Sequence, residues 1–237
     1  MNHPQLPLSL RFPPDQRFAT FVGASAEAAL LADVASGERD DWCMVSGPQG
    51  SGKTHLLLAA CAAADAAGRR SVYLPLRHLA GQVDAVIGAQ EQADLIAIDD
   101  LDGIAPESDP EAGRNDQVAL FDLHNRARAA GGVILYAARQ TPHALPLSLP
   151  DLRSRLQQCT LLSLKPLDDD GRRELLRRRA DNRGLQLDDA VIDYLLRRFD
   201  RDLTSLTALL ERLDQASLAT QRRITVPFLR QFLPAQD

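Results

Sequence analysis

This sequence has little lysine, no basic excess, few cysteines and no long apolar run. Its 27 basic residues do not outweigh its 32 acidic ones, and the formal net charge is −5. A protein that holds duplex DNA by itself usually carries a positive field over its binding face. The charge balance therefore argues against direct, sequence-specific DNA binding.

The cysteine count and the hydropathy pattern exclude several other classes. Cysteines stand only at positions 43, 61 and 159, far apart and without Cys-x-x-Cys spacing, which argues against a disulfide framework and a zinc site. No apolar run approaches the ~20 residues of a membrane span. The N-terminus also lacks the basic start and apolar core of a signal peptide. We expect a soluble protein of the cytoplasm without membrane contact.

The scarcity of lysine is the most useful absence. Only Lys53 and Lys165 are lysines among the 27 basic residues, so the chain uses arginine almost wherever either cation would serve. A retained lysine therefore marks a position where a compact point charge is needed and a planar guanidinium would fit badly.

Strands and helices are predicted to alternate over the first two thirds of the chain. Apolar strands are expected at 42–47, 71–76, 94–100, 132–139 and 159–164. Helices are expected at 25–35, 52–67, 79–87 and 116–130, with a loop at 102–115. Such alternation is typical of a parallel sheet covered on both faces. The pattern predicts an α/β domain with a five-stranded parallel sheet.

After residue 165 the pattern changes to helices alone, expected at about 168–182, 189–198, 201–219 and 226–233. Leucines recur there at helical spacing, and arginine clusters interleaved with acids indicate solvated helix faces. We expect an extended N-terminal peptide at 1–14, an α/β domain at 15–165 and a small all-helical domain at 166–237.

The stretch GPQGSGKT satisfies the phosphate-loop pattern G-x-x-x-x-G-K-[ST] between a predicted strand and a predicted helix. Glycines let the backbone wrap round phosphates, and the helix N-terminus adds partial positive charge. Lys53 is predicted to reach the β and γ phosphates, and Thr54 to offer its hydroxyl to Mg²⁺. The predicted nucleotide-binding residues are Gly47, Pro48, Gln49, Gly50, Ser51, Gly52, Lys53 and Thr54.

The strand LIAIDD ends in two acids that complement this loop. Asp99 is predicted to hold Mg²⁺ together with Thr54, and Asp100 to orient the attacking water as a catalytic group. The alternative is a strand followed by an ordinary acidic turn. An intact phosphate loop earlier in the same chain favours the catalytic interpretation.

These motifs, with a C-terminal helical lid, resemble the P-loop AAA+ family and, within it, proteins like the bacterial replication initiator DnaA. The resemblance spans about residues 18–233. It is carried by FATFVGASAEAAL, LFDLHNRARAAGG, LRSRL and FDRDLTSL, at 18–30, 120–132, 152–156 and 199–206. DnaA's DNA-reading helix-turn-helix domain and its N-terminal interaction domain are not expected in this sequence.

Among DnaA-like proteins, the closest resemblance is to the regulatory inactivators, which carry a clamp-binding peptide at the N-terminus. The stretch QLPLSL is similar to that motif. An extended peptide presents alternate side chains on one side. Leu6, Leu8 and Leu10 would then enter an apolar pocket of the sliding clamp (the polymerase β subunit) while Gln5 makes amide hydrogen bonds. Alternatively, the leucines fold back onto the core.

The resemblance implies that this protein, carrying ADP or ATP with Mg²⁺, promotes ATP hydrolysis by DnaA and so prevents reinitiation of replication. Arg155 of LRSRL matches the family's arginine finger, a catalytic cation that acts in trans. Arg153 lies two residues away and competes for this assignment. In the alternative interpretation both arginines merely cover a loop near Asp151.

Two further positions follow from the resemblance. Arg201 of FDRDL matches the lid arginine that contacts the protein's own nucleotide, although an ion pair with a neighbouring aspartate is the alternative. Ala138 falls where relatives place a polar sensor residue, beside Arg139. Without a polar side chain there, we expect firm nucleotide binding but weak intrinsic hydrolysis.

Two functions remain open from sequence alone. The first is a regulator that couples the sliding clamp to DnaA through its AAA+ face. The second is an active AAA+ ATPase of the DnaA-related or helicase-loader type. Sequence leaves open whether the protein forms a homodimer or larger oligomer.

Overall fold

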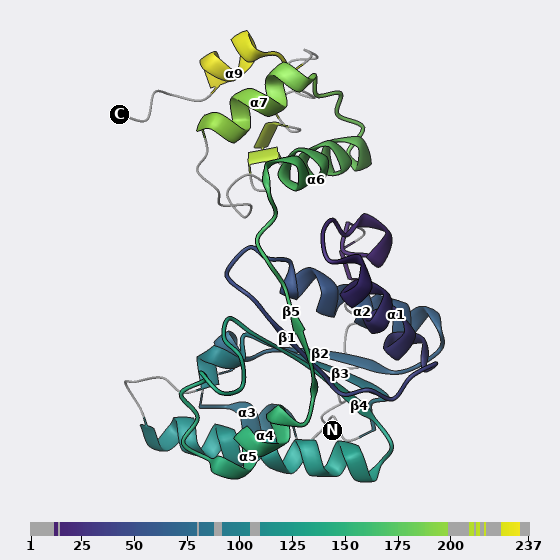
Figure 1. The fold of residues 1–237 in the computed structure, drawn as a ribbon, viewed down its shortest axis with the longest axis vertical. Coiled ribbons are helices and arrows are strands. Elements are labelled where there is room, and N and C mark those ends of the chain that lie inside the picture. Colours follow the sequence, from purple (N-terminus) through teal and green to yellow (C-terminus); the bar gives the residue numbers. More distant parts are fainter. Residues whose placement is uncertain are drawn as a thin grey trace, which may run out of the picture.

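The computed structural model describes residues 12–13, 15–79, 81–87, 92–104, 110–198, 209–210, 212–213, 216 and 224–232. Figure 1 shows two lobes joined by a single visible strand-to-helix connection. The larger lobe contains the sheet and its covering helices, and the smaller lobe contains helices that follow the last strand.

The larger lobe is built on a five-stranded sheet in the order β2-β3-β4-β1-β5, and every neighbouring pair is parallel. This confirms the predicted sheet. Because the strands are parallel, their carboxyl ends meet at one edge, where α/β proteins place their ligands. The strands are β1 Cys43–Ser46, β2 Ser71–Pro75, β3 Leu95–Asp99, β4 Val133–Ala138 and β5 Thr160–Ser163.

Helices cover both faces of the sheet, and two separate apolar cores result. On β4, Leu135 belongs to one core and Tyr136 to the other, because successive side chains of a strand point to opposite faces of the sheet. Every residue of β4 is buried, as expected for a strand covered on both sides. One face carries α1 Ser25–Ser36 and α2 Lys53–Ala66, and the other carries α3 Val83–Ile87, α4 Pro110–Ala129 and α5 Pro150–Gln157.

Three local predictions differ from the structure. Residues 110–115 were expected to belong to a loop, but α4 begins at Pro110, a residue tolerated in the first turn of a helix. The helix expected from residue 79 begins only at Val83. Helix α5 was not predicted, although Leu152 and Leu156 bury the same face four residues apart. Short 3-10 turns lie at Phe18–Thr20 (η1), Leu76–His78 (η2) and Leu101–Ile104 (η3).

The smaller lobe confirms the expected helical lid. Leu195, Leu210, Leu213 and Leu229 are almost completely buried in its core. Asp168 caps the first helix by accepting a hydrogen bond from the Gly171 N–H at 2.8 Å. Most of the helix predicted at 201–219 lies outside the described residues. The described helices are α6 Asp169–Asn182, α7 Asp189–Arg198 and α9 Val226–Phe232.

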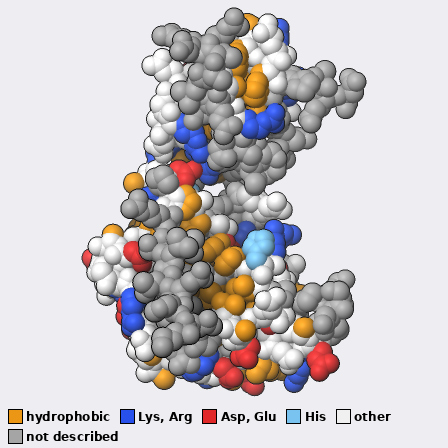
Figure 2. All heavy atoms as spheres, turned by 180° about the vertical axis from the view of Figure 1, so that it is seen from behind, with side chains coloured by type: hydrophobic (Ala, Val, Ile, Leu, Met, Phe, Trp, Pro, Cys, Tyr) orange, Lys and Arg blue, Asp and Glu red, His pale blue; other side chains and the backbone are white. Residues whose placement is uncertain are grey.

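Charges are mixed on the face of the molecule that Figure 2 shows. Figure 2 shows blue and red side chains interspersed around a hydrophobic area of the larger lobe. The three cysteines are free thiols and are buried. In the described part of the chain, no helix is long and apolar enough to cross a bilayer.

Candidate nucleotide-binding site

Residues 47–54 connect the carboxyl end of β1 to the first turn of α2. Gly52 caps α2 with a φ of +94°, which an L side chain adopts only with strain. A Cβ at this position would also lie 2.7 Å from a ring carbon of Phe21. The last glycine of the motif is therefore required both by backbone conformation and by packing.

Lys53 is held at the base of the loop. Its Nζ donates hydrogen bonds to the carbonyl oxygens of Gly47 at 2.7 Å and Pro48 at 2.8 Å. Burial lowers the pKa of Lys53, and the nearby carboxylates of Asp99, Asp102 and Asp100 oppose this shift. Since an ammonium group has three donors, one N–H is left over for an additional acceptor.

Asp99 lies beneath the loop with about 1% of its surface exposed. Its Oδ2 accepts hydrogen bonds from Thr54 Oγ1 at 2.6 Å and from the Tyr73 hydroxyl at 2.8 Å. Its Oδ1 accepts the backbone N–H of Asp100 at 2.8 Å. The structure thus brings together the two residues predicted to share Mg²⁺, and it adds a tyrosine from the neighbouring strand.

Tyr73 keeps its proton in this arrangement. Burial raises the pKa of its hydroxyl, and the adjacent Asp99 carboxylate raises it further. The hydroxyl is therefore a donor to the carboxylate at any ordinary pH. Sequence reasoning missed Tyr73 because only the pairing of β2 with β3 brings it near Asp99.

Asp100 follows the strand in a left-handed conformation with a φ of +53°. Such a conformation is uncommon for a residue other than glycine and is often found at functional sites. Its carboxylate forms an ion pair with Arg77 at 3.2 Å and lines the same cavity as the phosphate loop.

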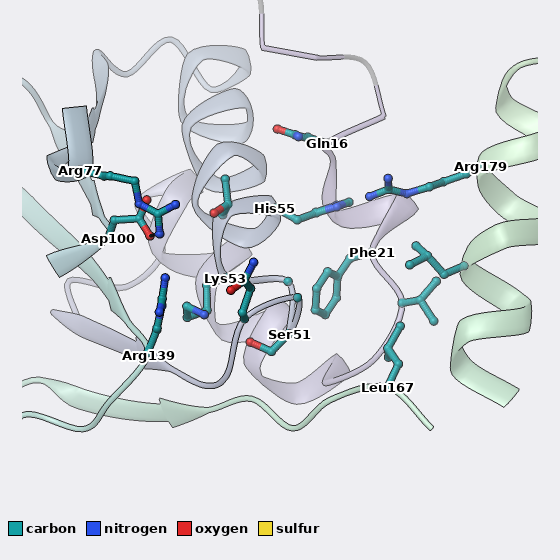
Figure 3. Close-up of a pocket in the computed structure, with 16 residues that line it drawn as sticks. Gln16, Phe21, Ser51, Lys53, His55, Arg77, Asp100, Arg139, Leu167 and Arg179 are labelled. Carbon is teal, nitrogen blue, oxygen red and sulfur yellow. Dashed lines mark hydrogen bonds and ion pairs between the residues drawn. The ribbon is translucent and has the colours of Figure 1, made fainter. Parts of the chain in front are cut away.

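Lys53, Thr54 and Asp100 line a cavity of about 560 Å³ that receives side chains from both lobes. Small-molecule sites span roughly 300–1,000 Å³. Figure 3 shows Lys53 and Ser51 at the loop, Asp100 with Arg77 to one side, and Phe21 and Leu167 on the other. The cavity is therefore large enough for a nucleotide, and the predicted residues of the loop lie at its base.

Ala138, which the resemblance matches to the polar sensor of relatives, does not line this cavity. Ala138 is completely buried in the core between the sheet and α4. The next residue, Arg139, lines the cavity and lies beside Lys53 in Figure 3. Its backbone N–H donates to both carboxylate oxygens of Asp102, at 3.1 and 2.8 Å. The cavity-facing position after β4 thus carries a cation.

A lid arginine of α6, Arg179, lines the cavity. Arg201 lies outside the described residues. Arg179 extends from α6 toward His55 in Figure 3 and lines the cavity. Burial lowers the pKa of His55, with a smaller contribution from Arg179, while a 2.9 Å hydrogen bond to the Arg17 carbonyl opposes it. His55 thus packs against the ring of Phe21 beside the cavity.

The two candidate arginine fingers occupy α5, and neither lines the nucleotide cavity. Arg153 donates from its guanidinium to the Leu147 carbonyl oxygen, which explains it as a structural residue. Arg155 is half-buried and lines a second, smaller cavity near Trp42. The clamp-binding candidates Gln5, Leu6, Leu8 and Leu10 lie outside the described residues.

Family models match both lobes. The AAA model (ATPase family associated with various cellular activities) matches residues 43–164, more than half of the chain, so this chain belongs to the AAA family. The model for the lid domain of Hda matches residues 169–233. The chain is thus an Hda- and DnaA-like AAA+ protein.

Solved structures support this fold. Domain III of the replication initiation protein DnaA from Thermotoga maritima has a TM-score of 0.79 at 21% identity, covering 94% of this chain and 97% of that one. AMPPCP-bound DnaA from Aquifex aeolicus has a TM-score of 0.67 at 22% identity, with coverages of 90% and 70%. The RuvB Holliday junction branch migration motor of Thermotoga maritima scores 0.65 at 18% identity, with coverages of 93% and 71%. At these identities the likeness establishes the fold.

Proposed function

We propose that the larger cavity binds ATP or ADP with Mg²⁺. The observation that carries this proposal is the 2.6 Å hydrogen bond between Thr54 and Asp99, directly beneath the phosphate loop. A hydroxyl and a buried carboxylate are oxygen ligands of the kind that Mg²⁺ takes in phosphate-loop proteins. The AMPPCP-bound DnaA with the same fold supports the same interpretation.

In this proposal, different residues of the chain bind the phosphates and the metal ion. The backbone N–H groups of residues 47–54 and the remaining N–H of Lys53 bind phosphate oxygens, while Thr54 and Asp99 hold the metal. Bound Mg²⁺ would supply positive charge against the phosphates. Arg139 adds a second cation beside Lys53, and Arg179 brings the lid to the nucleotide. Asp100 is the water-orienting group, and its ion pair with Arg77 restrains it, so we expect weak intrinsic hydrolysis.

We further propose that the protein regulates replication initiation by binding the sliding clamp through residues 5–10 and stimulating ATP hydrolysis by DnaA. The Hda-type lid and the DnaA-like fold support this function. Arg155 does not line its own nucleotide cavity but lines a second one, which is compatible with a role toward the nucleotide of a neighbouring molecule. The domain boundaries at 14/15 and 165/166, a cytoplasmic location and self-association belong to the same proposal.

The decisive experiment measures DnaA-bound ATP hydrolysis in the presence of DNA-loaded clamp and this protein. Arg155→Ala should abolish stimulation, because arginine fingers contribute roughly 10³–10⁵-fold in rate. Nucleotide binding by the variant should be unchanged, because Arg155 does not contact the nucleotide cavity. Stimulation that survives in Arg155→Ala would disprove the assignment of the finger.

Clamp binding is tested separately by calorimetry with the full chain. The double variant Gln5→Ala, Leu6→Ala should lose a saturable interaction with the clamp, whereas Ser9→Ala, in the same peptide, should keep it. If the double variant bound the clamp with the same affinity as the wild-type protein, this peptide would not be the segment that holds the clamp.

The second candidate is an active AAA+ ATPase of the DnaA-related or helicase-loader type. The complete acidic strand end, with Asp100 aimed at the cavity, favours it. Steady-state ATP turnover by the isolated protein distinguishes the two. Sustained ATP turnover by the isolated protein that is lost in Asp100→Asn would favour the active ATPase. Turnover that appears only with DnaA would favour the regulator.

A further inference from the structure

A second cavity of about 260 Å³ lies away from the nucleotide site, between the segment before β1 and helices α4 and α5. We propose that it is a receptor for an oxyanion, such as a phosphoryl group, bound by Arg128, Arg155 and His124 and bordered by Trp42. Its remaining lining residues are Asp40, Asp41, Gln158, Cys159 and Thr160.

The first observation is a buried histidine nitrogen without a partner. His124 is about 2% exposed, and its Nε2 has no hydrogen bond among the described residues. Its Nδ1 lies 3.0 Å from the hydroxyl of the completely buried Tyr136. A buried polar group without a partner is unfavourable, and native proteins rarely leave one unless a ligand or water uses it.

The hydrogen bond to Tyr136 determines which nitrogen carries the proton. Burial raises the pKa of the tyrosine well above its ordinary value, so its hydroxyl stays protonated. Among the described residues, the only hydrogen-bond acceptor near this O–H is His124 Nδ1. Nδ1 is therefore the acceptor, and the neutral imidazole carries its proton on Nε2. The unused group is thus a buried N–H donor that belongs to a residue lining the cavity.

The second observation is a pair of guanidinium groups beside this donor. Neither Arg128 nor Arg155 uses its guanidinium in a hydrogen bond or ion pair with another described residue. Both lie close enough to His124 to lower its pKa, which burial alone already depresses. Two arginines and an N–H donor that converge on one cavity suit the planar or tetrahedral oxygens of a carboxylate or phosphate.

The acidic residues that line the cavity do not cancel the positive charge of Arg128 and Arg155. Asp41 already forms an ion pair with Arg39 at 2.7 Å, and this pairing lowers the pKa of the Asp41 carboxyl. Asp40 is exposed. Two guanidinium groups therefore face one unpaired carboxylate, and the cavity keeps a net positive charge.

The size of the cavity limits what can enter. Small-molecule sites begin at about 300 Å³, so this one fits a single charged group better than a whole nucleotide. The phosphoryl group comes either from phosphate in solution or from a nucleotide held by a second AAA+ protein, and only the latter source rests on the proposed function.

The chain contains a built-in reporter for this cavity. Trp42 is the sole tryptophan in the sequence, and its ring lies 4.4 Å from the ring of His124. We would titrate inorganic phosphate into the full-length Lys53→Ala variant, which removes the phosphate-loop lysine, while chloride keeps the ionic strength constant. A saturable change in Trp42 fluorescence is expected.

Arg128→Gln and Arg155→Gln should each weaken this binding by about tenfold or more, since hydrogen bonds to charged groups are among the stronger ones. Arg230→Gln, an exposed arginine of α9 with the same change in charge, should bind like the parent. The proposal would be overturned if the Trp42 fluorescence changed linearly with phosphate or changed equally with chloride. Equal phosphate affinity in all variants would overturn it as well. A response to Mg²⁺ instead of phosphate would assign the cavity to cations through its aspartates.

A second measurement needs no substitution. Long-range ¹H–¹⁵N spectra of the histidines should show His124 protonated at Nε2 and should show this N–H shifting with phosphate at the same midpoint as the fluorescence. A proton on Nδ1 would contradict the donor assignment.

The DnaA assay distinguishes the two sources. If Arg128→Gln lowers stimulation of DnaA as well as phosphate affinity, the neighbouring nucleotide supplies the group. If stimulation is unchanged while phosphate binding is lost, the cavity serves a free anion. A wild-type protein that does not stimulate DnaA would refute the proposed function, while the phosphate titration would still test this cavity.

Discussion

The two cavities of this protein differ in how their cations are held. In the nucleotide cavity, Lys53 already has two carbonyl acceptors from its own loop, and Asp99 already has three donors. In the smaller cavity, the guanidinium groups of Arg128 and Arg155 have no hydrogen-bonding partner among the described residues. One site is assembled by the chain itself, whereas the other has donors left over for something external.

This difference matches the two kinds of role that a phosphoryl-transfer protein needs. A group that binds its own nucleotide benefits from preorganisation, because the geometry is fixed before the ligand arrives. A group that acts on another molecule must instead stay accessible and uncommitted. The following predictions test this contrast, from the largest expected effect to the smallest.

The titration of His124 gives the largest effect. Burial, with help from Arg155 and Arg128, lowers its pKa to about 4, so the folded state binds this proton less readily than the unfolded state. Stability is therefore full above the ordinary histidine pKa and falls as the pH drops toward 4, by up to about 3 kcal/mol at ~1.4 kcal/mol per unit. Urea unfolding at several pH values would measure it.

His124→Gln is the matched variant, since its amide can still accept from Tyr136 but does not titrate between pH 4 and 7. The difference between the wild-type and variant curves should fall with decreasing pH in that window. If the two stability curves ran parallel, His124 would not be held neutral in the folded protein. The smaller cavity would then lack the neutral N–H donor that distinguishes it from the nucleotide cavity.

Lys53→Ala tests the preassembled cavity. At ~100 times its dissociation constant, a nucleotide stabilises the folded state by about 2.7 kcal/mol, and this gain should disappear in the variant. Thermal melting with and without ADP would measure the loss, and Lys165→Ala would control for removing a lysine that does not line the cavity. An unchanged shift of the melting temperature in Lys53→Ala would refute the phosphate site.

Sequence identified the first cavity well because its parts are local. The phosphate loop is defined by a strand, a loop and a helix in succession, and Asp99 by the apolar strand that precedes it. By contrast, strand pairing brings Tyr73 to Asp99, and Arg139 and Arg179 reach the cavity only through the folding of the sheet and the position of the lid.

Other differences between the sequence-based predictions and the structure also arise from contacts between distant segments. Glycine and proline between 102 and 115 predicted a loop, yet buried Asp116 accepts hydrogen bonds from the backbone of Gly81 and Val83 and so ties the start of α4 to another segment. The resemblance to DnaA-like proteins matched Ala138 to a polar sensor position, but the two-residue period of a fully covered strand directs its side chain into the core. Contacts between distant segments decided both outcomes.

Gly52→Ala separates backbone strain from packing in the preassembled loop. The variant combines a φ of +94° with a Cβ placed 2.7 Å from Phe21, so a loss of about 1–3 kcal/mol in unfolding free energy is expected. Gly68→Ala has a φ of +76° with nothing within 4 Å of its Cβ, and it should show only the backbone part, about 1 kcal/mol. Equal losses in denaturant unfolding would mean that Phe21 moves aside without cost.

Tyr73→Phe gives the smallest effect and tests whether Asp99 needs all its donors. Removing one buried hydrogen bond to a carboxylate should lower the unfolding free energy by about 1–2 kcal/mol, while ADP binding persists because Thr54 still donates to the same oxygen. Tyr194→Phe removes a hydroxyl that, among the described residues, accepts a hydrogen bond from Arg198 at 3.3 Å, and it should change stability by less than about 0.5 kcal/mol. If both variants behave alike, the tyrosine is a passive neighbour of Asp99, and the nucleotide cavity is less tightly assembled by its own chain than its hydrogen bonds indicate.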